Sequence, residues 1–216
     1  MLAPEALLDA AIRVVSRDGL GALTLDAVAK EAGVSKGGLT HHYATKDALV
    51  TAMLEHFAQR LLRELDRFAA DDPELKGRRI RAMMKVGFPE LRDDAQTNGR
   101  AGRTKGTATK RVGTGASSEV QQFFLAAITA SVVNPDLLKP LRHHAGEMRE
   151  RMMGQSPDGL WQVVTWLALD GLMLWQMLGL LPKNDPLQSR MLRLLYTLSS
   201  EPPAAVLEQE AQDAAS

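Results

Sequence analysis

The chain has 216 residues, and 45% of them are hydrophobic, which is enough to bury a core in one domain or in two small ones. Basic and acidic residues balance at 26 each, so the formal net charge of zero disfavours a protein that coats nucleic acid through overall charge. The absence of cysteine excludes disulfides, thiolate catalysis and cysteine-ligated zinc sites. It also fits a reducing compartment, and we expect a cytoplasmic protein.

Two segments bear on targeting and membrane insertion. Residues 1–10 lack a charged start followed by an apolar run, so no signal peptide is expected. Residues 159–181 are strongly apolar but carry Gln162, Asp170 and Gln176. Because such side chains are costly in lipid, this run predicts a buried helix and no membrane partner.

Two helices are predicted in the first 33 residues. Apolar residues recur at helical spacing from about residue 4 to residue 17, and Gly19 and Gly21 end that run. Thr24 then occupies an N-cap position ahead of a second, short helix, because its side-chain oxygen can accept from first-turn N–H groups. Gly33 follows this helix directly and predicts a tight turn.

A third and a fourth helix follow the turn. Ser35 can cap a short helix that carries Leu39 and Tyr43. Thr45 can cap the next helix, and Asp47 lies in its first turn, where the helix dipole favours an acidic residue. The helical period then continues to about residue 70, so this fourth helix has about 23 residues and spans roughly 35 Å.

Three residues meet the requirements of a helix-turn-helix corner. The small Ala29 lets two helices cross closely, Gly33 permits the positive φ of the turn, and Leu39 fills the shared core from the second helix. The turn, at about residues 33–35, is as short as the motif requires. The pattern predicts a second helix that can read a DNA major groove, although a two-helix corner with a glycine turn also occurs in many other helical proteins.

The outward-facing residues of the second motif helix are candidates for contact with DNA. Gly37 and Gly38 each weaken a helix interior by roughly 0.5–1 kcal/mol relative to alanine, but in the first turn they expose backbone N–H groups to a phosphate. With the apolar residues turned inward, Lys36, Thr40 and His41 fall on the outer arc. There they can meet a base edge or a phosphate.

Two further residues flank this arc. Lys46 begins the following helix and is placed to hold backbone phosphate, whereas His42 fits either packing or a phosphate contact. Residues 1–50 carry five basic and six acidic side chains, a net charge of minus one. A single module is therefore expected to bind DNA weakly, and two copies far better.

The segment LTLDAVAKEAGVSKGGLTHHYATKDALV, Leu23 to Val50, resembles the DNA-binding module of the TetR family of bacterial transcriptional regulators. The resemblance rests on Thr24, the AxxxGVSKGGL core, the aromatic Tyr43 and Lys46, and it covers about the first quarter of the chain. It implies that the following residues lie near DNA: Thr24, Lys36, Gly37, Thr40, His41, His42 and Lys46.

The same resemblance implies a second domain and one departure from the family pattern. In this family a long fourth helix leads into a divergent helical ligand-binding domain, which dimerises through its last two helices. Many relatives have tyrosine where this chain has Thr40. The contact at Thr40 is therefore expected to be shorter and the base preference to differ.

The remaining chain is predicted to be helical, which makes the fold class all-α. Residues 95–118 hold five basic residues, no acidic residue and one bulky apolar residue, which predicts a flexible basic loop. The acidic tail at residues 201–216 is expected to be disordered. The predicted domains are a helix-turn-helix DNA-binding domain at 1–47 and a ligand-binding and dimerisation domain at 48–200. Its later helices are expected at residues 119–133, 135–153, 159–181 and 186–199.

The helix at residues 159–181 is apolar nearly all round, so it must contact neighbours on several sides. It carries two apolar stripes that each include a glycine, and either stripe can form a dimer interface together with the helix at 186–199. The first stripe consists of Trp161, Thr165, Ala168, Leu172, Trp175 and Gly179. The second consists of Leu167, Gly171, Leu174 and Leu178.

A third stripe on this helix consists of Trp166, Asp170, Met173 and Met177. A carboxylate is costly to bury unless it is paired, while methionine and tryptophan make an adaptable, polarizable wall. We expect this stripe to bind a small apolar or amphipathic inducer, with Asp170 addressing a cationic or hydrogen-bonding group. The alternative is a structural Asp170 that pairs with Arg190, Arg193 or a backbone N–H.

No group of residues in the sequence supports catalysis, a cofactor or a metal site. A serine elbow, a zinc motif and a paired-carboxylate arrangement are lacking. His143 and His144 point about 100° apart on a helix, so they cannot share one metal and are read as surface or interface residues.

The prediction from the sequence is a homodimeric, ligand-responsive regulator that binds a double-stranded DNA operator. It is most simply a repressor of an efflux or metabolic operon, released by a small-molecule inducer, and not an enzyme. The alternative is a helical small-molecule binding protein or enzyme that keeps the two-helix corner only as a scaffold.

Overall fold

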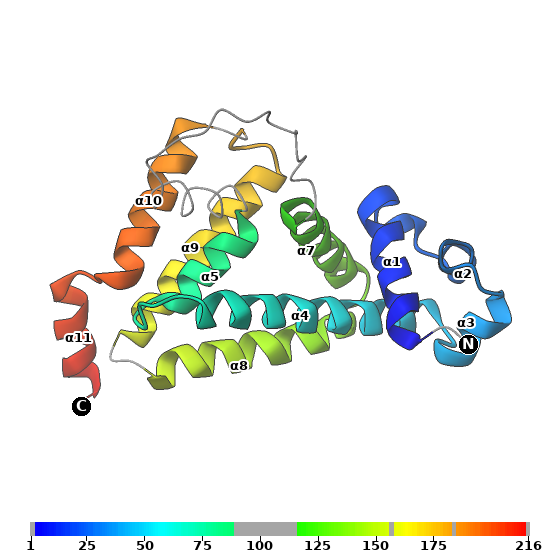
Figure 1. Cartoon of the computed structure of the whole chain (residues 1–216), viewed down its shortest axis with the longest axis horizontal. Helices are drawn as coiled ribbons and strands as arrows, with labels where there is room; N and C mark the ends of the chain where they lie inside the picture. The colour runs from blue at the N-terminus through cyan, green and yellow to red at the C-terminus, as the bar shows by residue number, and fades with distance from the viewer. Residues whose placement is uncertain (1–2, 89–115, 156–157, 183–184, 215–216) are drawn as a thin grey trace, which may run out of the picture. The chain divides into compact units, whose positions relative to one another are not determined.

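The computed structural model describes residues 3–88, 116–155, 158–182 and 185–214 (Figure 1). Every regular element within these ranges is helical, which confirms the all-α prediction. None of the described helices combines the length and the apolar character that a membrane crossing requires. The chain packs as two compact units, residues 1–63 with 118–148 and residues 64–117 with 149–216.

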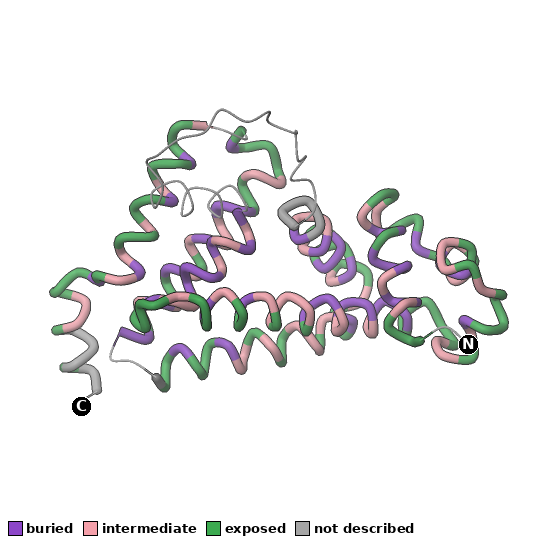
Figure 2. The backbone as a smooth tube through the Cα atoms, viewed as in Figure 1, coloured by how far each residue is buried: buried purple, intermediate pink, exposed green. Residues whose placement is uncertain are grey.

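The first unit contains the N-terminal helices that the sequence predicts and two later helical segments. Its elements are α1 (Pro4–Asp18), η1 (Leu20–Ala22), α2 (Leu25–Ala32), α3 (Lys36–His42), the first part of α4 (Lys46–Ala70), α7 (Ala116–Val133), η2 (Pro135–Leu138) and the first part of α8 (Lys139–Gln155). Buried residues recur along α1 and along the beginning of α4 (Figure 2). These two helices therefore contribute much of the core of the unit.

Leucine side chains from successive elements fill this core. Leu7, Leu23, Leu39 and Leu49 are all at most 2% exposed. Further along α4, the ring of Phe57 stacks on that of Phe123 in α7, with centroids 4.0 Å apart. Aromatic stacking at this separation adds roughly 0.5–1.5 kcal/mol to the burial of the rings. It fixes α7 against α4.

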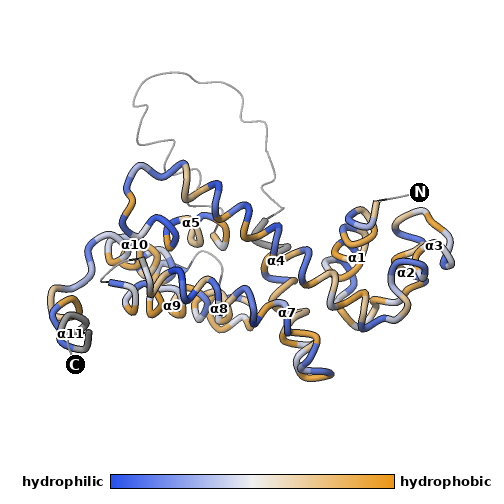
Figure 3. The backbone as a smooth tube through the Cα atoms, turned by 90° about the horizontal axis from the view of Figure 1, so that it is seen from below, coloured by the Kyte–Doolittle hydropathy of each residue, from blue (hydrophilic) through white to orange (hydrophobic). Residues whose placement is uncertain are grey.

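Helix α4 is long and amphipathic. It has 25 residues, in agreement with the predicted length, and hydrophobic and hydrophilic segments alternate along it (Figure 3). The hydroxyl oxygen of Thr45 accepts a hydrogen bond from the Ala48 N–H at 3.1 Å, as the N-cap prediction requires. The residues of α4 up to Arg63 belong to the first unit and those from Glu64 to the second, so one helix is shared by both.

The second unit is built on three helices that contact one another. These are α5 (Arg78–Gly87), α9 (Gly159–Met177) and α10 (Pro186–Ser200). The end of α8 and α11 (Ala204–Ala214) belong to the same unit. The indole N–H of Trp161 in α9 donates to the carbonyl oxygen of Leu198 in α10 at 2.9 Å. The pair α9 and α10 is thus held by a polar contact as well as by apolar packing.

A buried arginine fixes the connection between α4 and α5. Arg81 is 1% exposed, and its five N–H donors are taken up by the carboxylate of Asp72, by the carbonyl oxygens of Glu74 and Lys76, and by the hydroxyl of Ser200. Burial alone would raise the pKa of Asp72, but the hydrogen bonds from the guanidinium hold it below its ordinary value. The cost of burying this charge is therefore offset by full hydrogen bonding.

Two segments differ from the sequence-based expectations or lie beyond what is described. The tail was expected to be disordered, but the structure has helix α11 at Ala204–Ala214. Pro202 and Pro203 precede this helix, where proline is tolerated, and its alanine, glutamate and glutamine residues have high helix propensity. Residues 95–115 of the expected basic loop lie outside the described residues, and residues 116–118 begin α7.

Candidate nucleic-acid interface

The corner begins with a capped helix. Thr24 has an extended backbone, and its hydroxyl oxygen accepts a hydrogen bond from the Ala27 N–H at 3.0 Å, which confirms its predicted N-cap role. Val28 and Ala29 are the buried residues of α2. The small side chain of Ala29 is 4% exposed, as expected for a position where two helices approach each other. This helix is thereby fixed at its start and along its inner face.

Gly33 ends α2 with the backbone conformation that the corner needs. Its φ of 67° and ψ of 31° lie in the left-handed region, and the Val34 N–H closes the helix by donating to the Ala29 carbonyl at 3.0 Å. No atom lies within 4 Å of where a Cβ would stand on Gly33. Glycine is therefore required here for its conformation and not for space.

Helix α3 is capped and anchored by its own residues. The Ser35 hydroxyl accepts from the Gly38 N–H at 3.1 Å, and Leu39 is fully buried. Tyr43 follows the helix with its N–H bonded to the Leu39 carbonyl at 2.9 Å, and burial raises the pKa of its phenol. With Leu39 and Tyr43 turned to the core, the other residues of α3 face outward. In two perpendicular views α3 lies beside α2 (Figures 1 and 3).

The outward face of α3 holds most of the predicted contact residues. Lys36, Gly37 and His41 are exposed, while Thr40 and His42 are half-buried. The Thr40 hydroxyl donates to the Gly37 carbonyl at 3.1 Å, so its one donor is used within the helix. The methyl group and the oxygen lone pairs of Thr40 remain available to a partner. The rings of His41 and His42 contact edge to face, with centroids 5.5 Å apart.

Lys36 carries a partner that sequence reasoning missed. Its ammonium nitrogen lies 2.8 Å from a carboxylate oxygen of Asp26 in the first turn of α2, and both side chains are more than half exposed. An exposed pair of this kind contributes at most about 1 kcal/mol, so a phosphate can replace Asp26 at small cost. Asp26 therefore belongs to the candidate interface as a competing negative charge.

Lys46 lies at the exposed start of α4. Among the described residues no carboxylate pairs with its ammonium group, whereas the neighbouring Asp47 accepts a hydrogen bond from Asn134 at 3.4 Å. The positive end of a helix and a free lysine both favour an anion nearby. Lys46 is thus an exposed cation of this corner whose ammonium group has no carboxylate partner in the described part of the chain.

Other basic residues of the first unit serve its own packing. The guanidinium groups of Arg13 and Arg17 on α1 both bind the carboxylate of Glu31 on α2, at 2.9 and 3.0 Å. Hydrogen bonds from Arg13 and then from Arg17 hold the pKa of Glu31 below its ordinary value. These arginines join α1 to α2 and orient the corner. From the sequence, these two arginines contributed only to the net charge of residues 1–50, and their bonds to Glu31 were not predicted.

One histidine of the adjacent pair in α8 is less exposed than expected. His143 is exposed, but the side chain of His144 is 16% exposed and its ring nitrogens lie 3.0 Å from Glu55 and 3.7 Å from Glu147. Of the two predicted roles, surface or interface, His143 has the first, whereas His144 packs against α4 within the same unit. Within the described residues, no cluster of histidine and carboxylate side chains has the arrangement of a metal site.

The candidate ligand stripe of α9 lies partly inside the second unit. Met173 is buried, and Trp166, Asp170 and Met177 are half-buried. Burial raises the pKa of Asp170 to about 6, even though a hydrogen bond with the Trp166 side chain lowers it. Arg190 and Arg193, the alternative partners, are exposed on α10. Among the described residues the structure records no ion pair between either arginine and Asp170, and the Trp166 side chain is its recorded partner.

The two apolar stripes of α9 differ in how far they are exposed. In the first stripe Thr165 and Leu172 are at most 3% exposed and the indole N–H of Trp161 donates to α10, so this part of the stripe belongs to the core of the unit, whereas Trp175 is 54% exposed. In the second stripe Leu167 is 62% and Leu178 60% exposed. The second stripe is therefore the more exposed of the two among the described residues. Exposed apolar residues on α9 and α10 outside the second stripe are Leu160, Val164, Trp175, Leu187, Leu194 and Tyr196.

The capped corner, the long helix after it and a second helical unit define an all-α helix-turn-helix protein. The family model of bacterial regulatory proteins of the tetR family matches residues 7–53, which include the whole corner. A second model, of a tetracyclin repressor-like C-terminal domain, matches residues 107–200. The chain belongs to the tetR family.

Curated relatives of the chain are described as helix-turn-helix transcriptional regulators. The HTH-type transcriptional regulator BetI of Stenotrophomonas maltophilia is 30% identical over 99 residues, which are 46% of this chain and 48% of the relative. BetI of Burkholderia thailandensis is 32% identical over 90 residues, which are 42% of this chain and 44% of the relative. The matched part of the chain thus spans about half the length of these relatives.

Solved structures share the fold over most of the chain. A transcriptional regulator from Rhodococcus sp. Rha1 has a TM-score of 0.66 at 21% identity and covers 92% of this chain and 96% of its own. The multidrug binding protein EbrR, complexed with imidazole, has a TM-score of 0.58 at 24% identity and covers 95% of this chain and 99% of its own. These similarities support the two-unit helical architecture.

Proposed function

We propose that the chain is a DNA-binding regulator of transcription, most simply a repressor, which acts in the cytoplasm as a homodimer and responds to a small molecule. The observation that carries this proposal is the corner at Gly33. Its positive φ and the buried Leu39 leave the polar residues of α3 on an outer face. The match of residues 7–53 to the tetR family model supports the same function, and we propose no catalytic role.

The contacts with DNA divide into phosphate and base contacts. Lys46 and Lys36 are the exposed cations at the starts of α4 and α3, and we assign them to backbone phosphates. Thr40 and His41 lie on the outer side of α3, where a methyl group can contact a thymine and an imidazole can bond to a base edge. The half-buried His42 and the N-cap Thr24 support the position of α3 against the backbone of the duplex.

Dimerisation follows from the more exposed stripe of α9 and from the charge of the module. The second stripe of α9 and the apolar residues of α10 form an exposed surface of the kind that marks protein interfaces. Gly171 lies in this stripe with open space around it, which permits close approach of a second helix. Because residues 1–50 carry a net charge of minus one, two modules on half-sites about one DNA turn apart are needed for tight binding.

A ligand site in the second unit explains a response to small molecules. The stripe of Trp166, Asp170, Met173 and Met177 offers an adaptable apolar wall and one carboxyl without a charged partner among the described residues. We propose that it takes an apolar or amphipathic molecule with a cationic or hydrogen-bonding group. The solved structures of EbrR hold ethidium, malachite green and proflavin, and this protein shares the fold. Since α4 belongs to both units, a ligand that favours one position of α4 changes the spacing of the two α3 helices.

A gel-shift titration tests this function. The full-length protein is expected to retard DNA from upstream of its own gene at lower concentration than random DNA of equal length and base composition. Equal affinity for both DNAs, or no retardation of either, would contradict a regulator. It would leave a helical small-molecule binding protein that uses the corner as a scaffold.

A further inference from the structure

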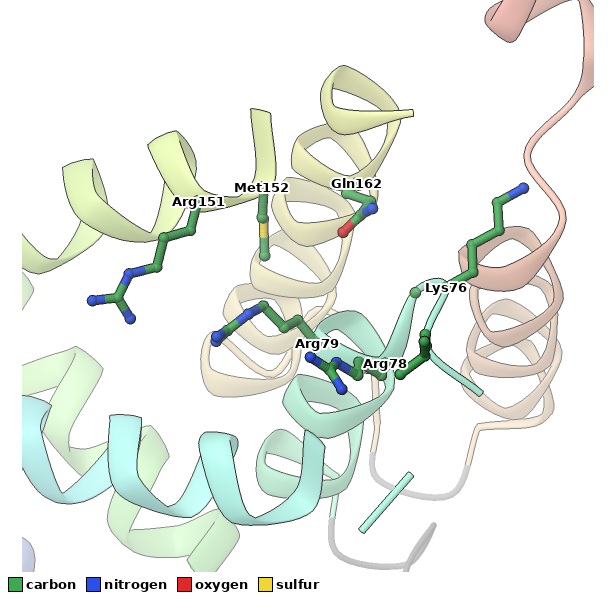
Figure 4. Close-up of a pocket in the computed structure, with 8 residues that line it drawn as sticks. Lys76, Arg78, Arg79, Arg151, Met152 and Gln162 are labelled. Atoms are coloured by element: carbon green, nitrogen blue, oxygen red, sulfur yellow. The ribbon is translucent and has the colours of Figure 1, made fainter. Parts of the chain in front are cut away.

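A basic cavity lies in the second unit, apart from the corner and from the Asp170 stripe. Its volume is about 290 Å³, and it is found where the start of α5 meets the end of α8 and the start of α9 (Figure 4). None of the eight described residues that line it is acidic, and four of them are cationic. They are Leu75, Lys76, Gly77, Arg78, Arg79, Arg151, Met152 and Gln162.

The position of two of these cations is unfavourable without an anion. Arg78 and Arg79 form the first turn of α5, which has no acidic residue and no side-chain cap. The start of a helix carries partial positive charge, so a cation there is destabilising and a bound anion is stabilising. The cavity thus combines guanidinium groups with the positive end of a ten-residue helix.

Most of these charges have no acid of their own. Arg79 binds Asp66 at 3.0 Å through one guanidinium nitrogen, which leaves its other donors. Among the described residues, no carboxylate pairs with Arg78 or with Arg151. Figure 4 shows the side chains of Arg79 and Arg151 in the space below Met152, whereas Lys76 extends away from them. The binding groups of the cavity are therefore its three arginines.

A buried amide completes the lining. Gln162 is 9% exposed, and its Nε2 donates to the Asp158 carboxylate at 3.2 Å. In the described part of the chain no donor is bonded to the side-chain oxygen of Gln162. This oxygen is not among the buried side-chain atoms that lack a partner, so it is accessible and can accept a hydrogen bond from a hydroxyl or amide N–H in the cavity. Asp158 itself is 1% exposed and is not one of the described residues that line the cavity.

The backbone around the cavity is fixed by Gly77 and by the buried Arg81. Gly77 has a φ of 66°, and a Cβ at this position would stand 1.9 Å from the carbonyl oxygen of Ser199 in α10. Arg81 binds both the segment before Gly77 and the end of α10, at Ser200. The start of α5 is thus fixed in place, so the arginines on it are presented from a rigid support.

We propose that this cavity binds a small organic anion, with its phosphate or carboxylate group held by Arg78, Arg79 and Arg151. The oxygen of Gln162 accepts a hydrogen bond from a hydroxyl or amide group of the same molecule. Arginine suits both kinds of anion because its planar donors match their oxygens in pairs. This site is additional to the proposed regulator function and does not depend on DNA binding.

Calorimetric titration of the full-length protein tests the site. The probes are inorganic phosphate, glycerol 3-phosphate and succinate, with glycerol as the uncharged control, all at one ionic strength set by sodium chloride. Saturable binding of one anion is expected, and a preference for glycerol 3-phosphate or for succinate identifies the phosphate or the carboxylate class. Arg78→Gln and Arg151→Gln are each expected to weaken that binding about tenfold, because each removes a charged hydrogen bond.

Arg190→Gln serves as the matched control, because Arg190 is an exposed arginine on α10 of the same unit and does not line the cavity. It is expected to leave binding unchanged, and circular dichroism checks that all three variants remain folded. The proposal is overturned if no anion binds saturably at millimolar concentration. It is equally overturned if Arg190→Gln weakens binding as much as the cavity variants do, since only diffuse charge would then be at work.

Discussion

The ammonium nitrogen of Lys36 lies 2.8 Å from a carboxylate oxygen of Asp26, so the first turn of α3 is tied to the first turn of α2 at the candidate DNA interface. Both side chains are more than half exposed, which keeps the pair weak. The same carboxylate that orients Lys36 in the free protein competes with a phosphate for it. We therefore expect Asp26 to limit affinity for DNA more than it stabilises the fold.

Replacement of this carboxylate is expected to strengthen DNA binding. Asp26→Asn removes a negative charge beside the duplex and frees Lys36, so affinity is expected to rise by about three- to tenfold, which corresponds to roughly 1 kcal/mol. Fluorescence anisotropy with operator DNA measures the change. Asp136→Asn is the control, since Asp136 is an exposed acid of the same unit on η2. Weaker binding by Asp26→Asn would show that the pair positions Lys36 in the complex.

Gly33→Ala tests the backbone of the corner. A residue with a Cβ in the left-handed region destabilises the fold by roughly 1–2 kcal/mol. No atom lies within 4 Å of the Cβ position at Gly33, so no steric clash adds to this. The free energy of unfolding, measured by urea titration, is expected to fall by that amount. Gly146→Ala is the matched control in α8, also with open space, and it is expected to stabilise by roughly 0.5–1 kcal/mol. Equal effects of the two changes would contradict the assigned conformation of Gly33.

Asp170→Asn tests the buried carboxyl. Because burial raises the pKa of Asp170 in the folded protein from its ordinary value to about 6, the protonated carboxyl stabilises the fold at low pH, and this contribution is lost as pH rises through about 6. Asparagine cannot ionise, so the variant is expected to be more stable than the natural protein above about pH 7, by at most about 3 kcal/mol, and similar to it near pH 4. Thermal unfolding across this pH range measures the difference. A variant that is less stable at neutral pH would show that the carboxylate is paired and structural.

Leu167→Glu tests the proposed dimer face. Leu167 is 62% exposed in the second stripe of α9, so a charge there leaves the single chain intact and disrupts a helix interface. Sedimentation velocity is expected to show a monomer for the variant and a dimer for the natural protein. Val132→Glu, at an 81% exposed position on α7, is the control and is expected to remain dimeric. A dimeric Leu167→Glu variant would place the interface elsewhere.

Local signals in the sequence were enough to predict the corner. The capping roles of Thr24, Ser35 and Thr45 and the left-handed Gly33 depend on residues within three or four positions, and the structure confirms each of them. The buried Leu39 follows from the same short-range pattern. Element type and ends are therefore well determined by local chemistry in this part of the chain.

Contacts between distant segments were not predictable in the same way. The pair of Lys36 and Asp26 depends on the crossing of two helices, and the bond from Arg81 to Ser200 joins positions far apart in sequence. The two stripes of α9 have equivalent patterns, and only the packing of α10 against Trp161 shows which one is covered. The basic cavity likewise needs α5, α8 and α9 to be brought together.

The central claim, that α3 and the start of α4 bind DNA, is tested most directly by the salt dependence of operator binding. Lys46→Ala is expected to weaken binding to operator and random DNA alike and to lower the slope of log affinity against log salt by about one, whereas Thr40→Ala is expected to change base preference and leave that slope unchanged. Lys139→Ala, at an exposed lysine at the start of α8, is the control. Unchanged slope and affinity in Lys46→Ala, together with unchanged base preference in Thr40→Ala, would contradict the account.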